Sequence, residues 1–175
     1  MKCIVKIKEL DLLNKVYKAT FSLLNIPIEK RGIEMADTTI KDKYLIKGEP
    51  FLYTKEFEWV LQEGDIYIYG ISNYAAVELG ELAYVELPEI GDTFEEGKSM
   101  GIIEALKTVV DFYAPFDCEI VEVHSELEDD ASVITEDCYN EGWIVKVKPT
   151  GPTDVLIIPE NFVKQVEKEI EEGSH

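Results

Sequence analysis

A lysine that could accept a covalent modification stands in the middle of an apolar stretch. The stretch MGIIEALKTVVDFYAP covers residues 100–115, and Lys107 is its only basic residue. An Ile-Ile pair precedes the lysine and a Val-Val pair follows it, which predicts two short strands joined by a turn. The turn lacks Asn-Gly, so its type is not specified. Because lysine is rarely buried without a partner, we expect an exposed amine at a hairpin tip, where another protein could reach and modify it. The alternative, an ordinary solvated turn residue, stays open at this point.

Other catalytic chemistry is not indicated by the sequence. There is no Ser-His-Asp set, no phosphate-binding Walker loop and no HExxH motif. His124 is the only histidine apart from the terminal His175, and we interpret it as a surface strand residue. The three cysteines are widely spaced and form no CxxC or zinc pattern, so buried or free thiols are expected. The sequence therefore offers no recognisable catalytic set and no metal-binding pattern.

The charge distribution divides the chain near residue 50. Residues 1–50 contain ten Lys/Arg and seven Asp/Glu, a net of +3, whereas residues 51–175 contain seven and twenty-nine, a net of −22; together they give −19. This break predicts an N-terminal extension over 1–50 and a main domain over 51–172. The remaining residues, 173–175, read Gly-Ser-His and resemble a tag remnant. The acidic body excludes nucleic acid as a partner and favours basic protein surfaces, although acid that only maintains solubility is an equal alternative.

The expected location is the cytoplasm, without a membrane contact. No apolar run approaches the 18 residues of a membrane span, and lysines interrupt the N-terminal stretch too often for a secretory signal.

The expected elements are mainly short strands. In the extension, CIVKI predicts a strand, residues 10–24 predict an amphipathic helix, and RGIEMADTTIKDK predicts a connector. Farther on, Asn73 and Gly80 predict the start and stop of a short helix, and residues 159–172 predict a terminal helix with Pro159 in its first turn. Strands are predicted within 64–72, 81–92, 100–105, 108–114, 118–124 and 142–149, and their close spacing indicates a small barrel or sandwich.

The segment GDTFEEGKSMGIIEALK resembles the biotinyl/lipoyl attachment domain. It places Lys107 sixteen residues after Gly91 and three after Glu104. Several further segments, in the same order along the chain, are similar to the glycine cleavage H-proteins: YTKEFEWV, GISNYAAVELGELAYVELPEIGD, DFYAP and SELEDDASVITEDCYNEGWIVKVKP. The resemblance covers residues 51–172 and implies a hybrid barrel-sandwich fold.

The resemblance also implies a function and a set of site residues. It implies a carrier that is not itself an enzyme and binds no metal, with lipoate joined by an amide bond to Lys107. It also implies Glu104 as the acid that the attachment enzyme recognises. Glu58 and Asp111 match acids that lie near the loaded arm in the family; two solvated strand acids are the alternative. The implied partners are glycine decarboxylase, aminomethyltransferase, dihydrolipoamide dehydrogenase and a lipoate ligase or transferase, with an aminomethyl group as cargo.

Some residues depart from the family pattern and leave other functions open. Phe57 replaces a histidine, EALKT replaces ESVKA, and Cys118 replaces a glycine. An H-protein-like carrier could serve another pathway, either sulfur oxidation with a heterodisulfide-reductase-like complex or lipoate relay. A biotinyl carrier and an unmodified interaction module are further alternatives.

Overall fold

The structure is a computed structural model that describes residues 35–173, which lie in a compact unit beginning at Glu34. The predicted strand CIVKI, the predicted helix at 10–24 and the last two residues lie outside the described part. Within it, no helix is long and apolar enough to cross a membrane.

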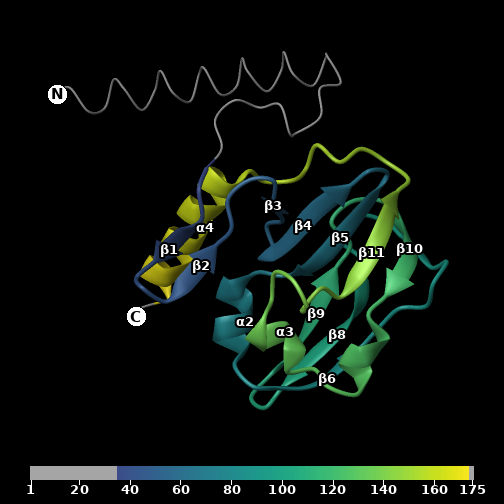
Figure 1. The fold of residues 1–175 in the computed structure, drawn as a ribbon, viewed down its shortest axis with the longest axis horizontal. Helices are drawn as coiled ribbons and strands as arrows, with labels where there is room; N and C mark the ends of the chain where they lie inside the picture. Colours follow the sequence, from purple (N-terminus) through teal and green to yellow (C-terminus); the bar gives the residue numbers. More distant parts are fainter. Residues whose placement is uncertain (1–34, 174–175) are drawn as a thin grey trace. The chain divides into compact units, whose positions relative to one another are not determined.

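Two antiparallel sheets form the main body (Figure 1). A six-stranded sheet has the order β3-β4-β5-β11-β10-β7, and a three-stranded sheet has the order β6-β8-β9. The strands of the first are β3 (Leu52–Tyr53), β4 (Glu58–Glu63), β5 (Ile66–Ile71), β7 (Thr93–Phe94), β10 (Cys118–Val123) and β11 (Val145–Pro149). Those of the second are β6 (Leu82–Glu86), β8 (Ser99–Ala105) and β9 (Val109–Tyr113). The expected mainly β fold is confirmed, and the two open sheets agree with the expected flattened barrel-sandwich.

Helices occupy the connections and the C-terminal end. They are α2 (Asn73–Leu79), the 3₁₀ turn η2 (Ser125–Glu128), α3 (Val133–Glu136) and α4 (Pro159–Glu172). Gly80 ends α2 with a φ of 75°, as predicted, but the N-cap is Ser72, whose hydroxyl accepts from the Ala75 N–H at 3.3 Å. The prediction of Asn73 as the cap was therefore wrong by one residue, because two residues with capping side chains are adjacent there. The predicted bounds of α4 are confirmed.

Large side chains from both sheets form one core. Trp59 is buried, and its indole N–H donates to the Cys138 carbonyl at 2.7 Å. Phe162 of α4 stacks on Tyr53 with ring centroids 3.9 Å apart, which fixes the helix against β3. Gly70 of β5 leaves room for the Trp59 ring of β4, which lies opposite it, since a Cβ there would lie 2.8 Å from the ring.

Residues 35–50 are built into this core. The predicted connector, residues 31–43, contains β1 (Thr38–Ile40), so that part of the prediction was wrong. β1 forms a hairpin with β2 (Tyr44–Ile46), which follows the connector directly. Ile40, Tyr44 and Ile46 are buried in the main core cluster. The connecting residues Lys41 and Asp42 have φ values of 51° and 54°, as a type I′ turn requires. No glycine marks this turn, which explains why the sequence did not reveal it.

Cys118 and His124 have surroundings that differ from those expected from the sequence. Cys118 lies buried in β10 and is not among the residues with positive φ, so replacing a glycine there costs no backbone strain. His124 is half-buried and not a surface residue. Its ring stacks on Trp143 at 4.5 Å between centroids, and its Nδ1 lies 2.8 Å from the Trp143 carbonyl oxygen.

Candidate functional site

Lys107 lies in the connection between β8 and β9. The hairpin is closed by a hydrogen bond from the Ala105 N–H to the Thr108 carbonyl at 2.8 Å. A second bond, from the Leu106 N–H to the Glu81 carbonyl at 3.1 Å, fixes the tip against the start of β6. The Lys107 side chain is exposed, and it has no hydrogen bond or ion pair with any residue of the described part. A fixed backbone thus presents a free amine.

The surroundings of the lysine combine apolar side chains with acid. Glu104 is exposed and lies between Tyr84 of β6 and Val109 of β9 in the strand register. Leu106 is 68% exposed and Val109 is 56% exposed, which is unusual for such residues. An enzyme that binds this hairpin would contact the lysine, an acid and apolar side chains together.

Asp111 lies farther along β9 on the exposed face. Its Oδ1 accepts from the Ser99 hydroxyl at 2.6 Å, across the pair of strands. Because side chains alternate along a strand, Asp111 shares this face with Val109 and Tyr113. Burial raises the pKa of the Tyr113 hydroxyl, and the negative charges of Asp111 and Glu58 raise it further. Tyr113 therefore lies within the electrostatic reach of both acids.

Glu58 is placed differently from Asp111, since it is buried. It begins β4, directly after Phe57, whose positive φ of 67° turns the chain at this point. The Glu58 carboxylate accepts hydrogen bonds from the Thr54 hydroxyl and from the Tyr113 N–H, the latter at 3.3 Å. Burial raises the pKa of this carboxyl, and the hydrogen bonds from Thr54 offset the rise only in part. The buried Tyr69 hydroxyl is close enough to interact with the carboxylate but lacks normal hydrogen-bond geometry.

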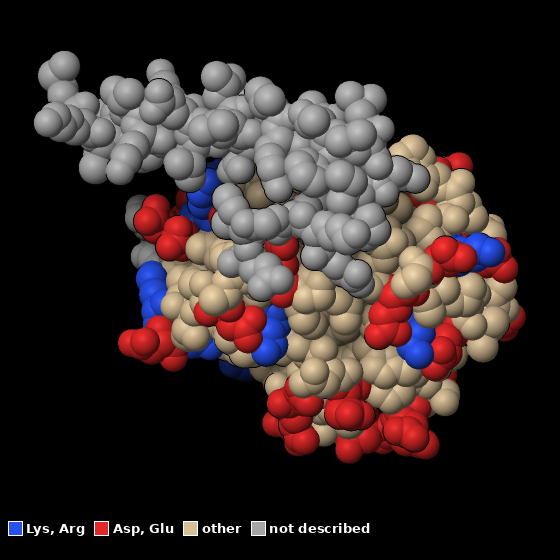
Figure 2. Space-filling model, turned by 45° about the horizontal axis from the view of Figure 1, so that its top comes forward, with Lys and Arg blue, Asp and Glu red and all other residues tan. Residues whose placement is uncertain are grey.

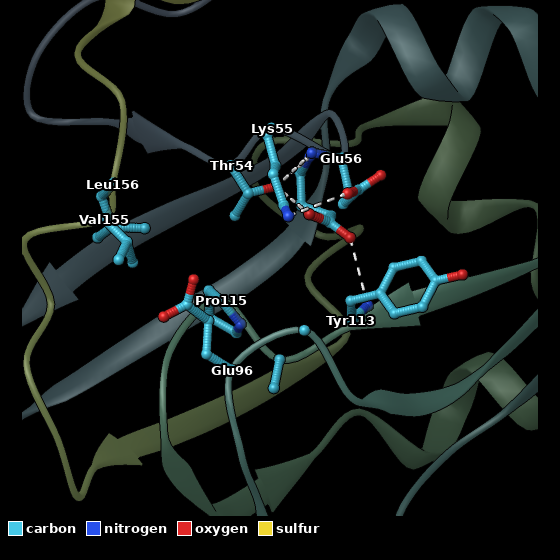
Figure 3. Close-up of a pocket in the computed structure, with 11 residues that line it drawn as sticks. Thr54, Lys55, Glu56, Glu96, Tyr113, Pro115, Val155 and Leu156 are labelled. Carbon is cyan, nitrogen blue, oxygen red and sulfur yellow. Dashed lines mark hydrogen bonds and ion pairs between the residues drawn. The ribbon is translucent and has the colours of Figure 1, made fainter.

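A small pocket opens beside this carboxyl group (Figure 3). Its volume is about 80 Å³, enough for a small substituent but not for a whole cofactor arm. In Figure 3 Val155 and Leu156 line one side, Glu96 lies below, and the Tyr113 ring points away from the opening. The lining includes the carboxylates of Glu56 and Glu96, and also Lys55, whose Nζ lies 3.8 Å from Glu56 Oε1. Acid therefore predominates over the single base, which suits a small group that carries a positive charge.

The structure therefore separates the predicted residues into two groups. Lys107 and Glu104 lie at the hairpin tip, while Glu58 lines the pocket, and Asp111 lies on β9 between them. Sequence reasoning missed Thr54, Glu96 and Tyr113, which join Glu58 in the pocket. All three belong to segments that carry the family resemblance, but nothing in those segments marks them as residues of a pocket. No cluster of three potential metal ligands occurs among residues 35–173.

Acid predominates on one part of the surface. Figure 2 shows Asp and Glu side chains gathered at the lower edge of the described part, where no Lys or Arg is visible. The whole chain carries a net charge of −19. Such a surface attracts basic partners and repels nucleic acid.

The chain is similar to proteins of one family over most of its length. The family model described as glycine cleavage H-protein matches residues 51–171. The glycine cleavage system H protein of one strain of Thermus thermophilus is 44% identical over 119 residues, which cover 67% of this chain and 93% of that protein. The Listeria innocua protein of the same name is 47% identical over 107 residues, covering 61% and 86%. The crystal structure of a glycine cleavage system H protein from Mycobacterium marinum superposes with a TM-score of 0.61 at 36% identity, covering 66% of this chain and 94% of that one.

Proposed function

Since the chain belongs to the glycine cleavage H-protein family, we propose that it is a lipoyl carrier whose arm is attached to Lys107. H-proteins are carrier subunits of the glycine cleavage system, and the chain covers nearly the full length of its relatives. The observation that supports the attachment site is the Lys107 amine, which is exposed at the tip of a fixed hairpin and has no partner among residues 35–173. The residues present fit the group, because an amide bond requires a free amine that a modifying enzyme can reach.

Attachment would proceed by acyl transfer to the Lys107 Nζ. The amine lone pair forms a bond to the carboxyl carbon of an activated lipoyl group, the activating group departs with the bonding electrons, and the nitrogen loses a proton. Glu104, three residues before the lysine, would contact the ligase or transferase together with Leu106 and Val109. These residues bind and orient the enzyme, and they do not take part in the reaction.

When bound, lipoate supplies a dithiolane that accepts and releases an aminomethyl group. The chain's own contribution is to hold the charged end of such a group. Glu58 would bind its ammonium in the pocket, with Thr54 and Tyr113 orienting the carboxylate by their hydrogen bonds. Val155 and Leu156 would exclude water from one side. Asp111 adds negative charge along the path on β9.

The rigid sheet holds the attachment point of the arm while the carrier binds each partner enzyme in turn. A tethered group is present at a high effective concentration at whichever partner has bound the carrier. The partners belong to the glycine cleavage system; the individual assignments proposed are glycine decarboxylase, aminomethyltransferase and dihydrolipoamide dehydrogenase, with a lipoate ligase or transferase for attachment.

Reconstitution tests this function. The lipoylated chain is mixed with glycine decarboxylase, aminomethyltransferase, dihydrolipoamide dehydrogenase and glycine, and NADH formation is followed. We expect turnover that requires the chain and is lost in Lys107→Arg. A chain that is fully lipoylated on Lys107 but inactive with all three enzymes would contradict the pathway while leaving the attachment site intact.

A further inference from the structure

The outer edge of β1 carries backbone groups that are available for strand pairing. Thr39 lies opposite Leu45 in the hairpin register. The Leu45 N–H donates to Asn73 Oδ1 at 2.8 Å, and the Leu45 carbonyl accepts from the Tyr139 hydroxyl at 2.9 Å. Both Leu45 groups thus point away from β1, so Thr39 and Leu45 form a non-hydrogen-bonded pair. It follows that the Thr39 N–H and carbonyl point away from β2.

These two groups have no partner within the described part of the chain. β1 pairs with β2 alone there, and Thr39 is exposed. By contrast, the Leu45 N–H and carbonyl on the outer edge of β2 are hydrogen-bonded to the side chains of Asn73 and Tyr139. An unpaired strand edge is a template for a further strand.

A groove runs between this edge and the C-terminal helix. Its volume is about 280 Å³, and it is lined by residues 38–41 on one side and by Val163, Glu167 and Glu171 on the other. Figure 1 shows β1 beside α4. The three helix residues recur every four positions and form one stripe. The stripe is about 12 Å long, which matches about four residues of an extended peptide.

The charges that line the groove indicate which kind of partner it binds. Glu167 and Glu171 are both exposed, and Lys41 is the single basic residue of the lining. The groove is therefore net negative, in a chain with a net charge of −19. A second copy of this chain would bring the same acids and the same net charge, so a basic partner fits better than self-pairing.

We propose that this groove binds an extended, basic segment of a partner protein, which adds as a strand to β1. The partner's backbone would exchange two hydrogen bonds with Thr39, and its basic side chains would meet Glu167 and Glu171. Strand addition between a sheet edge and a helix is an established mode of peptide recognition. The hairpin lies in residues 38–46, which precede the family match at 51–171. The α4 side of the groove lies within that match, but the groove lining includes neither Lys107 nor any residue of the pocket beside Glu58.

A titration with a synthetic peptide tests the proposal on the full-length chain. The probe is capped Lys-Val-Lys-Val-Lys, and binding is followed by amide chemical shifts. We expect the largest shifts at Thr39 and along α4. N-methylation of the central lysine, which removes one donor, should weaken binding by about fivefold, as expected for a lost hydrogen bond.

Two variants and a matched control locate the site on the protein. Thr39→Pro removes the edge N–H without touching the bonds to β2, because proline is tolerated at such edge positions. Thr39→Pro and Glu167→Lys should each weaken binding of the peptide by about fivefold. Glu169→Lys carries the same charge change on α4 outside the groove lining and should leave affinity within about twofold.

Four outcomes would overturn the proposal. They are the absence of binding, shifts located away from β1 and α4, equal weakening by Glu167→Lys and Glu169→Lys, and a dimer in sedimentation that Thr39→Pro dissociates. Equal weakening would indicate general attraction to an acidic protein, and the dimer would indicate a second copy as the occupant. If Thr39→Pro fails to fold, the N-methylated peptide still tests the backbone contact.

Discussion

The Tyr113 N–H donates a hydrogen bond to Oε1 of Glu58 at 3.3 Å, which joins the last residue of β9 to the first residue of β4. The two residues belong to different sheets. Through this bond, the strand that follows the Lys107 hairpin also orients the buried carboxyl of the pocket. The attachment point and the pocket are therefore held by one continuous strand.

The buried position of Glu58 predicts a pH-dependent stability difference. Burial raises the pKa of this carboxyl in the folded state, so the unfolded chain ionises first as pH rises. Stability associated with Glu58 is thus greatest at low pH and is lost as pH rises through its unfolded and folded pKa values. Glu58→Gln removes this loss. We expect the free energy of unfolding of the variant to rise relative to that of the wild type by up to about 1.4 kcal/mol per pH unit within that range.

Urea unfolding of both proteins between pH 4 and pH 7 measures this difference. Glu63→Gln, at the exposed end of the same strand, is the matched control and should show a constant difference. A constant difference for Glu58→Gln as well would mean that the Glu58 pKa is not raised in the folded state.

The β1–β2 hairpin predicts the effect of truncation. We compare chains that begin at residue 35 and at residue 51, so that residues 1–34 are absent from both. The longer chain retains three buried side chains, those of Ile40, Tyr44 and Ile46. Burial of such side chains stabilises by about 1.5–3 kcal/mol each, so the shorter chain should lose several kcal/mol of unfolding free energy.

Residues 51–172 are still expected to fold, because they contain both main sheets. Dispersed amide resonances in the shorter chain, with a lower urea midpoint, would agree with this expectation. Equal midpoints would show that the hairpin contributes nothing, and collapsed resonances would show that the domain over 51–172 is not independent.

The acids around Lys107 predict a salt-dependent reaction with partners. Physiological salt screens interactions between exposed charges that lie more than about 8 Å apart. Charged residues close to the docked face should therefore affect the reaction rate most. We expect Glu104→Lys to slow loading of the arm more than Glu63→Lys does, and rising salt to reduce the difference. Stopped-flow loading by glycine decarboxylase across a salt series measures both effects. If salt has no effect, or if both variants are equally slow, the acidic bias concerns solubility and not recognition.

Cys118 and Cys138, the cysteines within the described residues, are buried and should not react with the disulfide of an attached arm. Burial raises the pKa of Cys118 to about 12 and that of Cys138 to about 11, so almost no thiolate forms at neutral pH. We expect peptide mapping to find both thiols unlabelled by a maleimide in the native protein and labelled in denaturant. Rapid native labelling of either cysteine would contradict the prediction.

The strands that carry the site residues could be predicted from the sequence, but the contacts between residues of different strands could not. Ile-Ile and Val-Val pairs on both sides of Lys107 indicate a hairpin because local composition suffices for short strands. The pocket needs Thr54, Glu96 and Tyr113 to meet, and no local pattern specifies contacts between such distant residues. The β1–β2 hairpin was missed for another reason, since its strands have three residues each and Lys41 takes a positive φ without a glycine signal.

Mass analysis after treatment with a lipoate ligase tests the central claim most directly. The wild-type chain and Lys107→Arg are treated in parallel, and intact masses and peptide maps are recorded, with Lys98→Arg as the matched control on the same part of the chain. We expect one added lipoyl group, located on the peptide that contains Lys107, in the wild type and in Lys98→Arg but not in Lys107→Arg. A lipoyl group on any other lysine, or one retained in Lys107→Arg, would contradict it.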